Sequence, residues 1–171
     1  DGHRLAQYDI PLPQGAEEIT GVIISKKTIF ELRKVLDDAD GDVNISLNEN
    51  KIKFTFSNLK IISKVIDGTF PDYTKVIPQN NDKRIKTKNS DLKSAIDRVT
   101  AVAINEESKS KAIKLSVEDN KLYLSVESQS KGSANEEIDI NYKSDKVDIG
   151  FNSRYLTDIC NEVDGDEIDI S

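Results

Sequence analysis

The feature that most constrains this chain is a two-residue alternation of apolar and polar side chains within short segments. Because successive side chains of a strand point to opposite faces, this period is typical of strands that bury one face and leave the other in water. The alternation marks residues 43–47, 52–56, 113–117, 122–126, 138–142 and 147–151. Turn-forming residues separate neighbouring segments, so the pattern predicts hairpins in antiparallel sheets.

Three other segments have apolar side chains at helical spacing. The first runs roughly over residues 26–38, the second opens at Asn89, where the run Asn-Ser-Asp is typical of an N-cap, and the third follows Asn152 and Ser153. The chain is therefore predicted to be α+β, with amphipathic helices packed on antiparallel sheets.

A weak internal repeat links the first and third helices. A shift of 124 positions aligns residues 32–42 with 156–166, so that in both places a helix is followed by Asp-Gly-Asp and then by a strand. Any amphipathic helix that ends in this way would align about as well, but the recurring order favours a duplicated domain. The segment 71–89, with two prolines and a polar run, is a favourable place for a linker between the copies.

Composition limits the classes of function. A formal net charge of −7 argues against a protein that binds nucleic acid over its whole surface, so any DNA contact must be local. The chain has one cysteine, Cys160, and neither a long apolar run nor a signal-like N-terminus, from which we expect a cytoplasmic protein with no membrane role. It has no methionine, and we expect that it was cut from a longer chain.

Signals of catalysis or metal binding are weak. His3 is the single histidine, so histidine-based catalytic or metal sites cannot be assembled from this chain. The acidic run at residues 37–42 fails the register of a calcium loop. Paired carboxylates at 106–107 and 136–137 would point apart on a strand and are explained more simply as exposed charge. We therefore expect no catalytic residue, metal or cofactor, and rank a carboxylate-based hydrolase third among the alternatives.

The first helix carries the most informative charge pattern. At about 100° per residue, its basic side chains fall within an arc of about 120°: Lys26, Lys27, Arg33 and Lys34. The opposite face is predicted to be buried and apolar: Ile29, Leu32, Val35 and Leu36. A local positive field of this kind can face DNA phosphates, although an ordinary solvated helix face explains it equally well. The second helix mixes Lys93 and Arg98 with Ser94 and Asp97 and is not basic by itself.

Three further segments together resemble one protein family. They are residues 1–6 (DGHRLA), 65–73 (VIDGTFPDY) and 149–156 (IGFNSRYL). In this order and spacing they are similar to the hallmarks of the bacterial DNA polymerase III beta subunit, the sliding clamp. Each segment alone is weak, but the set is specific, and the resemblance covers the whole chain and less than half of a family subunit.

The resemblance implies a DNA-clamp fold. In that family a subunit has three similar domains, and two subunits close head to tail into a ring with sheets outside and paired helices lining the hole. Residues 1–72 would be the second half of the middle domain, 73–82 a linker, and 83–171 the first part of the C-terminal domain. The acidic charge would lie on the outer surface and the basic helices would line the hole.

The resemblance also implies sites and partners. The residues facing the DNA backbone would be Lys26, Lys27, Arg33, Lys34, Lys93 and Arg98. The pocket that captures a short peptide motif would include Gly2, His3, Arg4, Leu5, Pro71, Lys75, Val76, Asn152 and Tyr155. The implied partners are encircled double-stranded DNA, DNA polymerase catalytic subunits, the clamp loader and repair proteins. The alternative from another class is a non-enzymatic β-rich protein-interaction module without nucleic-acid binding.

Overall fold

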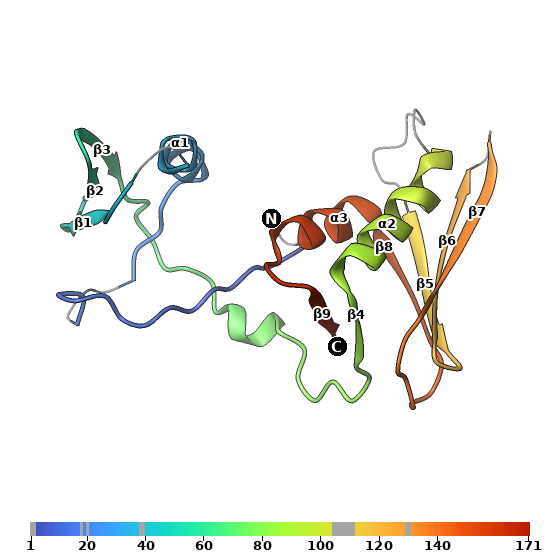
Figure 1. The fold of residues 1–171 in the computed structure, drawn as a ribbon. Helices are drawn as coiled ribbons and strands as arrows, with labels where there is room; N and C mark the ends of the chain where they lie inside the picture. The colour runs from blue at the N-terminus through green and yellow to red at the C-terminus, as the bar shows by residue number, and fades with distance from the viewer. Residues whose placement is uncertain (1–2, 18, 20, 38–39, 104–111, 129–130) are drawn as a thin grey trace. The chain divides into compact units, whose positions relative to one another are not determined.

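The computed structural model describes residues 3–17, 19, 21–37, 40–103, 112–128 and 131–171. The chain divides into two compact units. The smaller unit is formed by residues 6–77, and the larger unit by residues 78–171 together with residues 3–5. Figure 1 labels the helices and strands of both units.

The smaller unit packs one helix on a three-stranded antiparallel sheet. Helix α1 spans Lys26–Leu36, and the sheet has the order β1-β2-β3. Its strands are β1 (Asn44–Leu47), β2 (Lys51–Phe56) and β3 (Leu59–Lys64). The alternation predicted for β2 is confirmed, because Ile52, Phe54 and Phe56 are buried beneath α1. A short 3-10 helix, Tyr73–Val76, follows.

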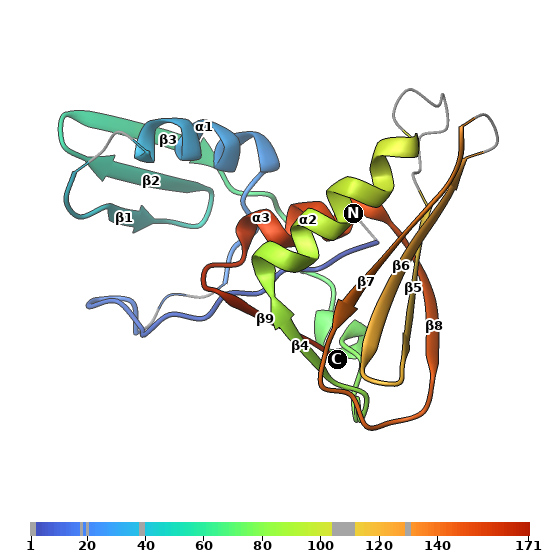
Figure 2. The same cartoon turned by 45° about the vertical axis from the view of Figure 1, so that its right-hand side comes forward.

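The larger unit places two helices beside a four-stranded antiparallel sheet, as Figures 1 and 2 show. The sheet has the order β7-β6-β5-β8, and a second sheet pairs β4 with β9. Its helices are α2 (Asn89–Thr100), continued by a 3-10 turn (Ala101–Ala103), and α3 (Ser153–Glu162). Its strands are β4 (Ile85–Lys88), β5 (Ala112–Glu118), β6 (Lys121–Ser128), β7 (Gly132–Asp139), β8 (Val147–Asn152) and β9 (Glu167–Ile170).

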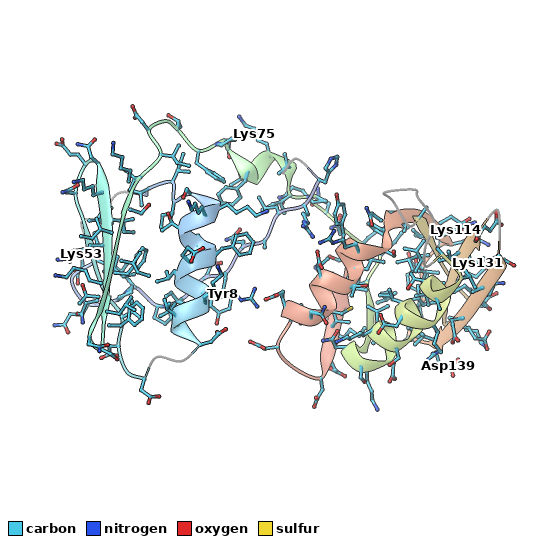
Figure 3. All side chains as sticks on the ribbon, turned by 90° about the horizontal axis from the view of Figure 1, so that it is seen from above. Tyr8, Lys53, Lys75, Lys114, Lys131 and Asp139 are labelled. Atoms are coloured by element: carbon cyan, nitrogen blue, oxygen red, sulfur yellow. The ribbon has the colours of Figure 1, made fainter. Side chains whose placement is uncertain are left out.

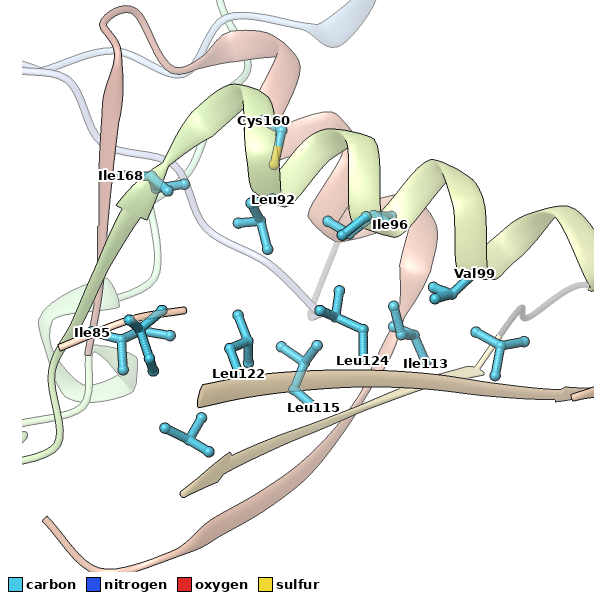
Figure 4. Packing of buried hydrophobic residues seen from close by; sticks show 14 of the residues in the cluster. Ile85, Leu92, Ile96, Val99, Ile113, Leu115, Leu122, Leu124, Cys160 and Ile168 are labelled. Carbon is cyan, nitrogen blue, oxygen red and sulfur yellow. The ribbon is translucent and has the colours of Figure 1, made fainter. Parts of the chain in front are cut away.

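The core of the larger unit lies between α2 and the four-stranded sheet (Figure 4). Ile96 and Val99 from α2 meet Ile113 from β5 and Leu124 from β6, and all four are fully buried. Cys160 enters the same cluster from α3. These residues follow the predicted periods, 3.6 in the helix and 2 in the strands, and the α+β class is confirmed.

Two local predictions are wrong. Residues 138–142 do not form one continuous strand, because β7 ends at Asp139. Tyr142 is instead buried in the segment after β7, where its backbone N–H donates to the side-chain oxygen of Asn120 and its hydroxyl donates to the carbonyl of Asp145. Asn89 does not cap α2, whose N-cap is Lys88. Instead, the side-chain amide of Asn89 donates to the carbonyl of Cys160 at 2.9 Å, near the C-terminal end of α3.

The order of elements at the predicted repeat recurs in the structure. Helix α1, Gly41 and β1 are followed 124 positions later by α3, Gly165 and β9. Both glycines have positive φ, +90° and +113°, which side-chain-bearing residues rarely adopt. The sharp turn after each helix therefore has the same chemical origin.

Within the described residues, none of the helices is long and apolar enough to cross a membrane. The described residues also hold no group of three or more histidine, cysteine or acidic side chains placed to bind a metal ion. The pair Glu106–Glu107, considered above as a candidate acid and base, lies outside the described residues.

Candidate functional site

The basic face of α1 is solvent-exposed along the helix. Ser25 caps the N-terminus by accepting from the backbone N–H of Thr28 at 3.2 Å. Buried Thr28 in turn shares a hydrogen bond with Ser63 of β3 at 2.7 Å, which ties the first turn of α1 to the sheet. The exposed basic side chains are the predicted ones: Lys26, Lys27, Arg33 and Lys34. The helix is thus fixed to the sheet on one side, while these four charges face water on the other.

Neighbouring side chains position two of these charges. The Lys34 ammonium lies 3.0 Å from the Glu31 carboxylate, and the Lys26 ammonium lies 5.4 Å from the centre of the Phe30 ring. Arg33 and Lys34 lie in the last turn, where the helix dipole favours cations. On the opposite face of α1, Leu32, Val35 and Leu36 are half-buried against the core. The prediction that Ile29 is buried is wrong in this unit, because its side chain is 47% exposed.

On α2 the two predicted basic residues have different environments. Lys93 is exposed near the start of the helix. Arg98, in the last turn, donates from Nε and Nη2 to the two carboxylate oxygens of Glu136 on β7, at 2.7 and 2.9 Å. This hydrogen-bonded pair lowers the pKa of Glu136 and raises that of Arg98. The guanidinium fork of Arg98 is therefore occupied by a carboxylate.

A second cluster forms on the exposed face of α3. The Arg4 guanidinium lies over the Tyr155 ring, 4.7 Å from its centre, and Nη1 donates to Asp158 at 2.5 Å. The imidazole of His3 is stacked near the same ring, with centres 6.4 Å apart. Asn152 caps the helix, because its side-chain oxygen accepts from the N–H of Arg154 at 3.1 Å. The structure thus brings together three of the residues predicted for the peptide pocket, His3, Arg4 and Tyr155, and places a fourth, Asn152, at the start of the same helix.

Asp158 is a member of this cluster that the sequence did not reveal. It lies three residues after Tyr155, so the two side chains share one face of α3. Helical spacing could have placed it there, but its partner Arg4 is 154 positions away, and no local pattern connects them. Such a cluster offers an aromatic surface with a cation and hydrogen-bonding groups at its edge, as peptide-binding surfaces commonly do.

The predicted pocket has five further members. Pro71, Lys75 and Val76 belong to the smaller unit, where the Asp72 carboxylate caps the 3-10 helix. Lys75, labelled in Figure 3, lies 3.3 Å from that carboxylate, and Val76 is 68% exposed. Hydrogen bonds from the side chains of Thr74 and Lys75 lower the pKa of Asp72. Leu5 is exposed in the larger unit, and Gly2 lies outside the described residues.

Family models match the chain in two consecutive parts. Residues 1–72 match the central domain of the DNA polymerase III beta subunit, and residues 74–171 match its C-terminal domain.

Curated relatives named beta sliding clamp are similar over almost the whole chain. The Caulobacter vibrioides protein (strain NA1000 / CB15N) is 41% identical over 165 residues, which are 96% of this chain and 44% of the relative. The Staphylococcus aureus protein (strain Mu50 / ATCC 700699) is 33% identical over 171 residues, which are 99% of this chain and 45% of the relative. The chain therefore spans less than half the length of these relatives.

Solved structures give the same result. A DNA polymerase III subunit beta sliding clamp from Bartonella birtlesii, bound to griselimycin, is 43% identical with a TM-score of 0.90, and the match covers 99% of this chain and 45% of that one. The DNA polymerase sliding clamp from Caulobacter crescentus is 40% identical with a TM-score of 0.88, covering 99% and 44%.

Proposed function

Because the chain belongs to the DNA polymerase III beta subunit family, the sliding clamps, we propose that it forms part of a clamp that encircles duplex DNA. The observation that carries this proposal is the consecutive match of the central and C-terminal domain models over the chain. The complete protein would be a non-catalytic, head-to-tail homodimer in the bacterial cytoplasm. It would tether DNA polymerase catalytic subunits, the clamp loader and repair proteins to DNA.

We assign the DNA-facing role first to the basic face of α1. Four exposed cations on one helix face supply a local positive field in a chain with a net charge of −7. Contacts to phosphates carry no sequence information and weaken with salt, as a ring that slides requires. We propose that Lys93 and Arg98 of α2 also face DNA, although Arg98 forms an ion pair with Glu136.

We assign peptide capture to the cluster around Tyr155. The Tyr155 ring, with the His3 and Arg4 side chains against it, offers a large rigid contact surface with polar groups that can orient a peptide. Pro71, Val76 and Leu5 add apolar area, and Gly2, Lys75 and Asn152 complete the proposed set. The Bartonella birtlesii relative bound to griselimycin supports the proposal that such proteins bind ligands.

Two variants of the complete protein test the two roles against each other. Reversing the charges of Lys26, Lys27, Arg33 and Lys34 to glutamate should abolish loading and processive synthesis while leaving affinity for a polymerase-derived peptide unchanged. Tyr155→Ala should weaken peptide binding by about 2 kcal/mol or more, as for an aromatic anchor, while the protein keeps its salt-dependent affinity for duplex DNA.

Matched controls exist on the sheets. Four lysines of β2 and β3 lie on the sheet face turned away from the buried Ile52 and Phe54, and Figure 3 labels one of them, Lys53. These lysines are Lys51, Lys53, Lys60 and Lys64. Replacing all four with glutamate gives the same change in net charge and leaves α1 unaltered. For Tyr155, the control is Tyr123→Ala on β6. Unchanged processivity after the α1 reversal would refute the assignment of α1 to DNA.

A further inference from the structure

The pair formed by Arg98 and Glu136 is the best-defined ionic contact on the helix face proposed to meet DNA. Both guanidinium nitrogens that point at β7 donate to separate oxygens of one carboxylate, at 2.7 and 2.9 Å. The Arg98 side chain is 57% exposed and that of Glu136 is 28% exposed. The pair is therefore half open to solvent and within reach of an outside anion.

The strand geometry makes this contact specific to one of two adjacent carboxylates. Residues alternate across β7, so Glu136 shares the face of Ala134 and Ile138, which pack against the core beneath α2. Glu137 points to the other face, where its carboxylate lies 2.6 Å from the Lys121 ammonium of β6. The same strand thus carries a carboxylate that holds Arg98 and a neighbouring carboxylate that does not.

A carboxylate and a phosphate compete for the same feature of arginine. Each presents two oxygens at a spacing that matches the planar guanidinium fork. A DNA phosphate that binds the Nε–Nη2 edge of Arg98 must therefore displace Glu136 and leave that carboxylate without its partner. The net gain is the difference between two similar sets of hydrogen bonds, which is much smaller than the gain from a free arginine.

We propose that Glu136 is a positioning residue that occupies the Nε–Nη2 edge of Arg98, so that this edge meets DNA by exchange of a carboxylate for a phosphate. This inference rests on the proposed clamp function and adds a residue to it. Its consequence is that Glu136 weakens the DNA contact of α2 and reduces its salt dependence. A weakened contact between Arg98 and phosphate suits a ring that must move along DNA.

The test measures affinity of the complete protein for a labelled duplex oligonucleotide over a series of salt concentrations. Glu136→Gln, which keeps the shape and removes the charge, should raise affinity several-fold. It should also steepen the slope of log K against log salt by about 0.9, the value for one added phosphate contact. Glu137→Gln is the matched control, with an equal change in net charge on the adjacent residue, and should leave the slope unchanged.

A double variant separates release of Arg98 from loss of a repelling charge. The gain from Glu136→Gln should vanish when Arg98→Gln is already present. Equal effects of Glu136→Gln and Glu137→Gln, or a gain that persists without Arg98, would overturn the inference and leave the clamp function standing. Loss of the loaded, unaltered protein from an intact circular duplex would instead overturn the clamp function itself.

Discussion

The two copies of the helix–glycine–strand pattern differ most in what covers their helices. In the larger unit α3 packs beside α2, and Cys160 on its inner face is 5% exposed. In the smaller unit α1 packs on β1–β3, and Leu36, at the position equivalent to Cys160, is only half-buried. The same local sequence pattern therefore specifies the helix and its end, while neighbouring elements decide how much of it is buried.

The exposed faces of the two helices differ as well. At the positions of Tyr155 and Asp158 in α3, helix α1 carries Glu31 and Lys34, which form an ion pair with each other. In α3 the equivalent pair instead holds Arg4 between an aromatic ring and a carboxylate. One scaffold thus presents a basic surface in one copy and an aromatic surface in the other, in line with the two roles proposed above.

The largest expected effect is on stability, because the larger unit has the more extensive buried core. Ile96 of α2 is fully buried, so Ile96→Ala should destabilise the larger unit by about 2–5 kcal/mol. Amides of β5 and β6 should lose protection from hydrogen exchange, while those of β2 keep theirs. Ile45→Ala, at a residue that is 56% exposed, is the control and should change stability by about 0.5 kcal/mol at most. Equal loss of protection in both units would show that they fold as one.

A smaller effect tests the shared turn. Gly41→Ala and Gly165→Ala should each cost about 1–2 kcal/mol, because both positions have positive φ while an added Cβ would meet no atom within 4 Å. Gly150→Ala in β8 also meets no atom but lacks the positive φ, so it is the control for the lost glycine. Chemical denaturation measures all three. A large cost at one turn and none at the other would break the equivalence of the two copies.

The smallest effect concerns the pH dependence of the pair formed by Arg98 and Glu136 in the larger unit. The hydrogen bond from Arg98 lowers the pKa of Glu136 below its ordinary value of 4.5. The stabilisation by this pair should therefore be complete above that value and be lost as pH falls through the lowered pKa. Carboxyl NMR should show Glu136 titrating below 4.5, and Arg98→Gln should raise its pKa toward 4.5. A Glu136 pKa that does not respond to Arg98→Gln would contradict the pairing.

The parts of the fold that could be predicted from sequence are those with a clean period. Strands β2, β5 and β6 alternate strictly, and α1, α2 and α3 have regular apolar spacing. Most of β7 was missed because its first six residues, GSANEE, have almost no apolar side chains and are held by pairing with β6. In β3 the adjacent Ile61 and Ile62 hide the alternation.

The candidate sites also differ in how far the sequence could predict them. The basic face of α1 follows from helical spacing within a single element. The contacts of Arg4 with Asp158 and of Arg98 with Glu136 join residues 154 and 38 positions apart, and only the folded chain brings them together. The pocket residues themselves came from the family resemblance, since each would otherwise be interpreted as core or linker.

The most direct test of the proposed function is the topology of DNA binding. The complete protein, loaded on a nicked circular plasmid, should remain bound through gel filtration at a salt concentration that abolishes direct phosphate contacts. Cutting the plasmid once should release it, because a ring can slide off a free end. Release from the intact circle under the same conditions, or retention on the linear product, would contradict the proposal that this chain is part of a sliding clamp.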